Sequence, residues 1–121
     1  MDWKNLKPLN VVPKEWGTEY WLVNNSLYCC KILALKKGFQ CSLHHHRTKD
    51  ETFIVLSGHV RLERNGVVKD ALPGERMHIS PYARHRFGGI EDSEILEVST
   101  HHSDDDVVRD APSGKMDVKN G

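Results

Sequence analysis

The sequence predicts an all-β fold, either a sandwich or a barrel, and two observations support this class. Short runs rich in β-branched and aromatic residues follow one another along the chain, with turn residues between them at regular intervals. No stripe of apolar residues at helical spacing is long enough to predict a helix that packs on a core. Because 121 residues is the usual size of one domain, we expect a single domain over 1–121 with its core in 12–110.

The first half of the chain supplies an edge segment and four strands. Residues 8–13 begin and end with proline and predict an extended edge, where proline is tolerated. Residues 19–24 and 27–36 are the next runs of aromatic and β-branched residues. The turn Lys37-Gly38 separates them from a strand at 40–46, and a short polar connection leads to a strand at 51–56.

Turn residues predict the order of the second half. Strands are expected at 59–64, 67–69, 75–79, 84–88 and 94–100, and the pairs Ser57-Gly58, Asn65-Gly66 and Pro73-Gly74 lie between them. Asn-Gly flanked by strand residues is the strongest short signal for a tight hairpin. The middle of the chain is therefore predicted to be a meander of hairpins.

The C-terminal region lacks this pattern. The acidic run at 104–106 is interpreted as a solvated cap on a short helical turn at 107–109, with a metal-binding loop as the alternative. Residues 111–121 are rich in Pro, Gly, Lys and Asp, so we expect a flexible, frayed tail.

Charge and cysteine content exclude several classes of function. The 17 Lys and Arg residues balance the 17 Asp and Glu residues, which leaves no basic field for nucleic acid or an anionic membrane. The N-terminus has no apolar segment of the signal-peptide type, and the apolar runs are too short to span a bilayer. Cys29 and Cys30 are adjacent and point to opposite faces of a strand, which favours reduced thiols over a disulfide framework. We expect a cytoplasmic protein.

Histidine is the unusual component, with 8 residues in the chain, three of them consecutive. Side chains alternate between the faces of a strand, so His44 and His46 point one way while Leu43 and His45 point the other. Glu51 opens the next strand, which is expected to pair back antiparallel and bring its carboxylate onto the face of His44 and His46.

A fourth ligand is expected from the second half of the chain. His85 follows a turn that contains Pro81 and opens another strand. Three imidazoles and one carboxylate would suit one divalent transition metal (Mn, Fe, Zn, Co or Ni), and are too rich in nitrogen for Ca or Mg. The alternative is an exposed polar edge without metal.

The spacing of these residues resembles the cupin superfamily. Gly38-x5-His44-x-His46-x4-Glu51-x6-Gly58 matches the first cupin motif without a gap. The second motif is similar to Pro73-Gly74-Glu75 followed by the run from Ile79 to Phe87, although Ser80 replaces the usual Pro and Tyr82 the usual Gly. The resemblance implies a small double-sheet barrel, or jelly roll, with metal held by His44, His46, Glu51 and His85.

Within that superfamily, the chain resembles the mannose-6-phosphate isomerase-like proteins over residues 12–109. The similar stretches are Glu15-Trp16-Gly17, Glu97-Val98-Ser99-Thr100 and Asp105-Asp106-Val107-Val108-Arg109. One position departs from that group, since the isomerases usually carry Gln where this chain has His44. The resemblance implies a role in carbohydrate metabolism, as a metal-dependent isomerase that interconverts an aldose and a ketose, either as a sugar or as a sugar phosphate.

Such an isomerase needs a base that is not a metal ligand. Glu97 on the last predicted strand is the first candidate, followed by His102 and Tyr82. Two other functions remain open. Three His and one Glu around Fe(II) also describe a cupin dioxygenase, and a barrel that only binds a sugar would need no base at all.

Other residues receive structural interpretations or open alternatives. Cys41 is expected to face outward with His45, so a nucleophilic role is disfavoured. Trp16, Trp21 and Phe53 could stack on a sugar or belong to the core. Residues 3–21, with their apolar and aromatic side chains, could pair or exchange with a second subunit, and we expect a homodimer.

Overall fold

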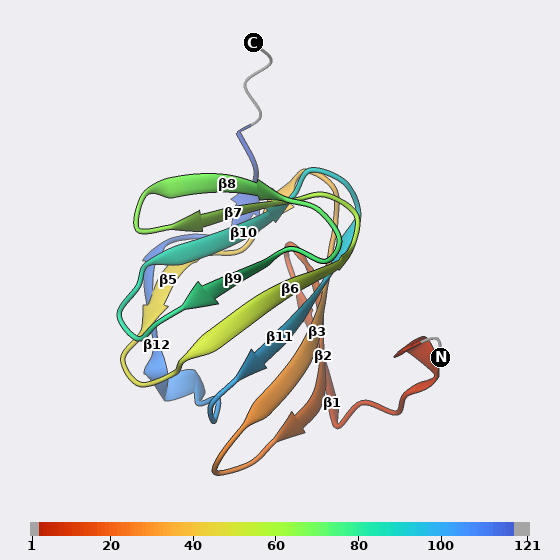
Figure 1. The fold of residues 1–121 in the computed structure, drawn as a ribbon, viewed down its shortest axis with the longest axis vertical. Coiled ribbons are helices and arrows are strands. Elements are labelled where there is room, and N and C mark those ends of the chain that lie inside the picture. Colours follow the sequence, from red (N-terminus) through yellow and green to blue (C-terminus); the bar gives the residue numbers. More distant parts are fainter. Residues whose placement is uncertain (1–2, 118–121) are drawn as a thin grey trace.

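The computed structural model describes residues 3–117 and consists almost entirely of strands (Figure 1). The helical elements are two 3-10 turns, η1 (Trp3–Asn5) and η2 (Asp104–Asp106). In chain order the strands are β1 (Asn10–Lys14), β2 (Gly17–Asn24), β3 (Cys29–Leu35), β4 (Phe39–Gln40), β5 (Leu43–His46), β6 (Glu51–Ser57), β7 (Val60–Arg64), β8 (Val67–Ala71), β9 (Arg76–Ile79), β10 (His85–Gly89), β11 (Ser93–Ser99), β12 (Val107–Ala111) and β13 (Gly114–Lys115). The all-β prediction is confirmed.

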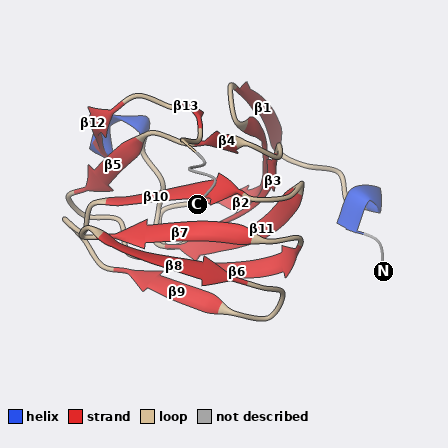
Figure 2. Ribbon diagram, turned by 90° about the horizontal axis from the view of Figure 1, so that it is seen from above, coloured by secondary structure: helices blue, strands red, loops and turns tan. Residues whose placement is uncertain are grey.

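The strands form two antiparallel sheets that face each other as a jelly-roll barrel (Figure 2). One sheet has the order β1-β2-β3-β11-β6-β9, and the other has the order β12-β5-β10-β4-β13 with β7 and β8 joined to β10. Side chains alternate between the two faces of each strand, and this determines which residues lie between the sheets. In β6, Phe53 and Val55 are buried while Thr52 and Leu56 point away from the core. Within the described residues, neither 3-10 turn is long or apolar enough to cross a membrane.

The hairpin predictions are confirmed in the meander. Asn65 and Gly66 both have positive φ, 49° and 82°, as a two-residue turn of type I′ requires. The strands beside the turn pair from Arg64↔Val67 to Val60↔Ala71. Gly58, the last glycine of the first motif, has φ 88°, and a Cβ there would collide with Ser93 and Asp92, so both backbone angle and space require glycine.

The predicted strand at 40–46 is interrupted, and this overturns one expectation. Residues 41 and 42 lie outside regular pairing between β4 and β5, so the alternation does not carry through the run. Cys41 is therefore buried, not outward, and its Sγ accepts the backbone N–H of Phe87 at 3.3 Å. Burial raises the pKa of the Cys41 thiol to about 12, which argues against a thiolate nucleophile.

The helical turn expected at 107–109 is wrong. The turn lies over the aspartates themselves, and residues 107–111 form β12, which pairs with β5. The two β-branched residues at its start favour a strand, and pairing with β5 outweighs the helical tendency of the acidic run. Asp106 has a different role from a solvated cap, since its carboxylate accepts backbone N–H groups of Arg47, Thr48 and Lys49 and so holds the β5–β6 loop.

The region expected to be a frayed tail has partners as far as Met116. Ala111 ends β12, the short strand β13 pairs with β4, and Met116 is buried. Its backbone N–H donates to the carbonyl of Gly38 at 2.8 Å. The remainder of the expected tail, residues 118–121, lies outside the described residues.

Candidate metal centre and adjoining cavity

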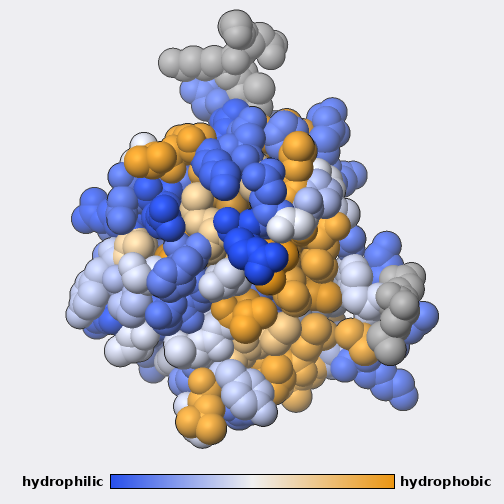
Figure 3. All heavy atoms as spheres, in the orientation of Figure 1, coloured by the Kyte–Doolittle hydropathy of each residue, from blue (hydrophilic) through white to orange (hydrophobic). Residues whose placement is uncertain are grey.

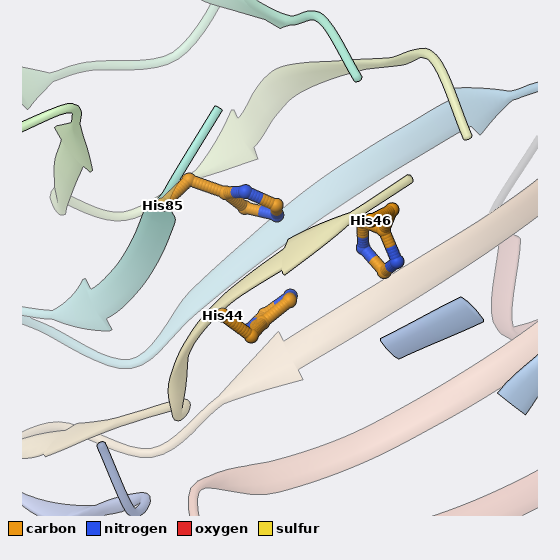
Figure 4. Close-up of side chains that lie close together, drawn as sticks. All are labelled: His44, His46 and His85. Atoms are coloured by element: carbon orange, nitrogen blue, oxygen red, sulfur yellow. The ribbon is translucent and has the colours of Figure 1, made fainter. Parts of the chain in front are cut away.

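Three histidines converge inside the barrel. His44 and His46 project from β5, and His85 projects from β10, where it is paired directly with His44 (Figure 4). One ligand atom from each ring can be chosen so that all three lie within 4.8 Å of one another. His46 and His85 are buried, and His44 is partly buried. The alternation of the strand and the second motif thus bring together the three imidazoles that the sequence singled out.

Backbone carbonyls orient two of the rings. His44 Nδ1 lies 2.8 Å from the Ser42 carbonyl oxygen, and His85 Nδ1 lies 2.9 Å from that of Ala83. A carbonyl only accepts, so in both rings Nδ1 carries the proton and Nε2 keeps a free lone pair. Metal-bound histidines are commonly held in this way, since the hydrogen bond fixes the tautomer and the ring angle.

Glu51 completes the group from the opposite sheet. Its Oε2 lies 3.0 Å from His46 Nε2 and 3.4 Å from His85 Nε2. The expected antiparallel pairing of the Glu51 strand with the histidine strand is wrong, because β6 pairs with β9 and β11 and the loop after His46 crosses between the sheets. The carboxylate therefore reaches the histidines across the barrel.

The possible ligand atoms are not satisfied by hydrogen bonds to one another, which favours a bound metal. Glu51 Oε2 and His85 Nε2 are both buried, yet neither makes a hydrogen bond within the described chain, although they lie 3.4 Å apart. Buried polar atoms without partners are costly, and a divalent cation among them would satisfy both. Three neutral nitrogens and one carboxylate oxygen are a usual donor set for a transition metal.

The protonation states also match this set. Burial, followed by the nearby His85, lowers the pKa of His44 to about 3, so the ring is neutral at physiological pH. Burial alone would raise the pKa of Glu51, but its close contacts with His46 and His85 and the charge of Lys49 hold that pKa well below its usual range. His44 and Glu51 therefore present lone pairs, not protons, to a cation.

These shifts predict that acid destabilises the metal-free protein. The pKa of His44 falls from 6.5 in the unfolded chain to about 3 in the fold, so between these values the unfolded chain binds the extra proton. The lowered pKa of Glu51 acts in the same direction below 4.5. We expect the melting temperature of chelator-treated protein to fall steadily from pH 6.5 towards pH 3, measured by circular dichroism. A melting temperature that stays constant over this interval would contradict these assignments.

A cavity of about 350 Å³ adjoins His44, His46 and Glu51. Register across the six-stranded sheet sets out one wall, because Trp21 pairs with Lys31, Lys31 with Glu97, and Glu97 with Phe53. These four side chains form one row on the inner face, and all of them line the cavity. Trp16 lines it as well and packs edge-to-face on Phe87, so it is a core residue that also borders the cavity.

Glu97 is buried in this wall, with 5% of its surface exposed, and it has a cationic partner. Lys49 Nζ donates to Glu97 Oε2 at 2.6 Å and to His102 Nδ1 at 3.0 Å. His102 Nδ1 is thus an acceptor, so Nε2 carries the proton and donates to Asp104 at 2.9 Å. Burial opposes the charge of Lys49, but Glu97 and Glu51 outweigh it and raise the pKa of the ammonium group.

Sequence reasoning missed the two buried lysines. Lys31 is one of the most deeply buried side chains of the protein, and Lys49 lies beside Glu97. The signal for Lys31 was available, because it alternates with Leu33 and Leu35 on β3 and must share their inward face. Lys49 gave no such signal, since it belongs to an irregular loop whose path Asp106 determines.

Tyr82 is not part of the cavity, which corrects its place among the candidate bases. It is 66% exposed and lies beside His45 on the outside of the barrel. Its φ of 68° is left-handed, which explains why glycine is usual at this position and costs about 1–2 kcal/mol for another residue. The turn keeps its shape because the backbone N–H of Tyr82 donates to the carbonyl of His46 at 2.6 Å.

Comparison with known proteins identifies the family. The sequence model for the cupin domain matches residues 31–100, a range that contains His44, His46, Glu51 and His85. The chain belongs to the cupin family. The predicted resemblance to the superfamily is thereby confirmed, whereas the narrower likeness to mannose-6-phosphate isomerase-like proteins stays a prediction. A search of curated proteins found no match.

Solved cupin structures share this fold at low sequence identity. KdgF from Halomonas sp. is 18% identical, with a TM-score of 0.68, and the match covers 73% of this chain and 81% of that one. An RmlC-like cupin from Shewanella frigidimarina is 16% identical, with a TM-score of 0.73 and coverage of 79% and 86%. Oxalate decarboxylase from Bacillus subtilis is 17% identical, with a TM-score of 0.74, and the match covers 83% of this cupin but 30% of that chain.

Proposed function

We propose that this cupin is a metal-dependent isomerase that interconverts an aldose and its ketose. One observation carries the proposal: the carboxylate of Glu97, which is not among the metal-binding group, is buried in the same cavity and held by Lys49. A buried acid–base group beside a cation site is typical of proton-transfer chemistry, and a purely structural ion pair would not need to face a cavity.

The proposed metal ligands are His44, His46, Glu51 and His85. When bound there, a divalent transition metal supplies positive charge that polarises a carbonyl and a neighbouring hydroxyl of a sugar. Because the four donors come from two sheets, they fix the position of that charge relative to the cavity wall. Aromatic side chains at Trp16, Phe53 and Phe87 border the cavity and exclude water from part of it.

Glu97 is the proposed base. Its carboxylate would accept the proton from C2 of the aldose and return it to C1 of the ketose, while the hydroxyl proton moves from O2 to O1. The ammonium group of Lys49 lies 2.6 Å from Glu97 Oε2, so a positive charge balances the carboxylate inside the barrel. His102 is placed to orient Lys49, and its link to the exposed Asp104 connects this group to solvent.

The test is exchange of the substrate's C2 proton with solvent. Metal-loaded protein should exchange the C2 proton of a sugar in D2O, followed by NMR, and should convert aldose into ketose. Because the proposed activity covers both free and phosphorylated sugars, D-mannose and D-mannose 6-phosphate are both assayed. Absence of exchange with either compound, and with a panel of pentoses and hexoses, would contradict the proposal.

A cupin dioxygenase is the second candidate, and the donor set is the observation that favours it. Three imidazoles and one carboxylate suit Fe(II) and leave coordination positions for substrate and O2. Oxygen consumption by Fe(II)-loaded protein with diketones, thiols or phenols would support this reading. A barrel that binds a sugar without turnover is the third candidate. Such a protein would bind a sugar but show neither proton exchange nor oxygen uptake.

We also propose that the protein is a homodimer. An apolar area covers part of the outer face of the six-stranded sheet (Figure 3), where Leu56 and Val98 are exposed. At the edge of the same sheet, Leu9 and Val11 are exposed beside and in strand β1. Exposed apolar patches and open edges of this kind are usually covered by a partner. Light scattering at micromolar concentration should give the mass of a dimer, and Val98→Lys should weaken association. A monomer in both proteins would refute the proposal.

A further inference from the structure

The inner wall of the cavity contains a cation, Lys31, that uses only part of its hydrogen-bonding capacity. Lys31 Nζ has three N–H donors, and its side chain is 2% exposed. Within the described chain, its contacts are Glu19 Oε1 at 3.5 Å and the ring of Trp21, whose centroid lies 4.1 Å away. One long contact and a ring face leave donor capacity directed at the cavity that Lys31 lines.

An acceptor lies directly beside this donor. Glu19 Oε1 accepts from Trp21 Nε1 at 2.9 Å and also faces Lys31. Both contacts of Glu19 in the described residues use Oε1, so Oε2 is available to accept from a ligand. Glu19, Trp21 and Lys31 all line the cavity. A sugar hydroxyl both donates and accepts, and the C–H face of a sugar packs on an indole ring, so this trio has the donors, acceptors and surface that a polyol needs.

Glu19, Trp21 and Lys31 are also positioned to contact the part of the substrate that does not react. Lys31 is the strand neighbour of Glu97, and Glu97 is the proposed base. Ser99, two residues after Glu97 on β11, pairs with Glu51 of the metal-binding group. Metal-binding group, base and trio therefore follow one another along the same wall, and a sugar whose reacting carbons face Glu97 extends its remaining hydroxyls towards Lys31.

Charge pairing argues against an anionic group at this end. Each buried cation of the cavity already faces a carboxylate, Lys49 with Glu97 at 2.6 Å and Lys31 with Glu19 at 3.5 Å. A phosphate or a carboxylate next to Lys31 would lie against Glu19 and repel it. The other basic residues that line the cavity, Lys14 and Arg109, are not buried.

We propose that the substrate is a neutral, unphosphorylated sugar whose non-reacting hydroxyls bind Lys31 and Glu19, with its C–H face against Trp21. This inference rests on the proposed isomerase function and narrows its substrate class. It assigns specificity to Lys31 and Glu19, while the chemistry stays with Glu97 and the metal-binding group.

Binding of inert analogues tests the inference apart from catalysis. D-Mannitol, D-mannitol 1-phosphate and D-mannonate share a carbon skeleton, differ in charge and lack the carbonyl that isomerisation needs. Calorimetry on the metal-loaded protein should show that mannitol binds at least about tenfold more tightly than either anion, a difference of about 1.4 kcal/mol. Tighter binding of the phosphate or of mannonate would overturn the inference, as would failure of all three to bind.

Variants locate the site. Lys31→Met and Glu19→Gln should each weaken mannitol binding by about tenfold or more. The first removes the buried ammonium donor, and the second replaces one acceptor oxygen of Glu19 with an amide group that only donates. Lys37→Met is the matched control, since Lys37 is exposed and pairs with Glu91 on the surface. Unchanged mannitol affinity in folded Lys31→Met protein would contradict the assignment, and the analogue series on the unmodified protein decides the question if that variant does not fold. Mannitol binding without proton exchange on any sugar would reject the isomerase and leave the neutral-ligand site in place.

Discussion

Glu97→Gln should slow exchange of the substrate's C2 proton by about 10²- to 10⁴-fold, because the amide cannot accept that proton. Metal content should not change, since Glu97 lies outside the group formed by His44, His46, Glu51 and His85. The amide oxygen can still accept from Lys49 Nζ, which lies 2.6 Å from the native carboxylate, so the barrel should keep its fold.

Two further measurements make this result specific to Glu97. Circular dichroism and metal analysis of the Gln variant separate loss of the base from loss of structure. Glu91→Gln serves as the matched control, because Glu91 is exposed and pairs with Lys37 at the surface. Full exchange activity in Glu97→Gln protein that retains its metal would remove Glu97 from the mechanism.

His85→Ala should abolish stoichiometric metal binding although it leaves the HxH strand intact. His85 is the proposed ligand from β10, and its Nε2 is a buried atom without a hydrogen bond in the described chain. A ligand that binds only the folded protein stabilises it by RT ln(1 + [L]/Kd), which is about 2.7 kcal/mol at 100 times Kd. Chelator should therefore lower the melting temperature of the native protein and have little effect on that of His85→Ala.

His78→Ala is the control for this experiment. His78 is exposed and contacts Asp50 on the outer side of the six-stranded sheet, away from the metal centre. Its replacement should leave metal content and chelator sensitivity as they are in the native protein. Equal metal content in the His85→Ala and native proteins would refute the four-ligand site.

The sequence predicted correctly those structural features that residues close together in the chain determine. The hairpin at Asn65-Gly66 and the shared face of His44 and His46 depend on turn geometry and on alternation within a single strand. The second motif placed His85 at the start of its strand. These features could be predicted from residues close together in the chain, and they supply the three histidines of the candidate metal centre.

The failures concern features that tertiary contacts decide. No local signal shows that the chain leaves one sheet after His46 and enters the other at Glu51. Nor does any show that the strand is interrupted at Cys41. Strand β12 forms because it can pair with the free edge of β5, whereas the acidic residues before it favoured the prediction of a turn. The pairing of Lys49 with Glu97 joins residues 48 positions apart, so only the fold could reveal that the candidate base has a cationic partner.

Elemental analysis of protein purified without added metal tests the central claim most directly. We expect close to one equivalent of a divalent transition metal per chain in the native protein, and a large loss of it in His44→Ala and His85→Ala. The same measurement on protein dialysed at acid pH should show release of the ion, because the ligands must be deprotonated to bind it. A native, folded protein that contains no transition metal and takes up none of Mn, Fe, Co, Ni or Zn when these are supplied would contradict the metal centre and the isomerase built on it.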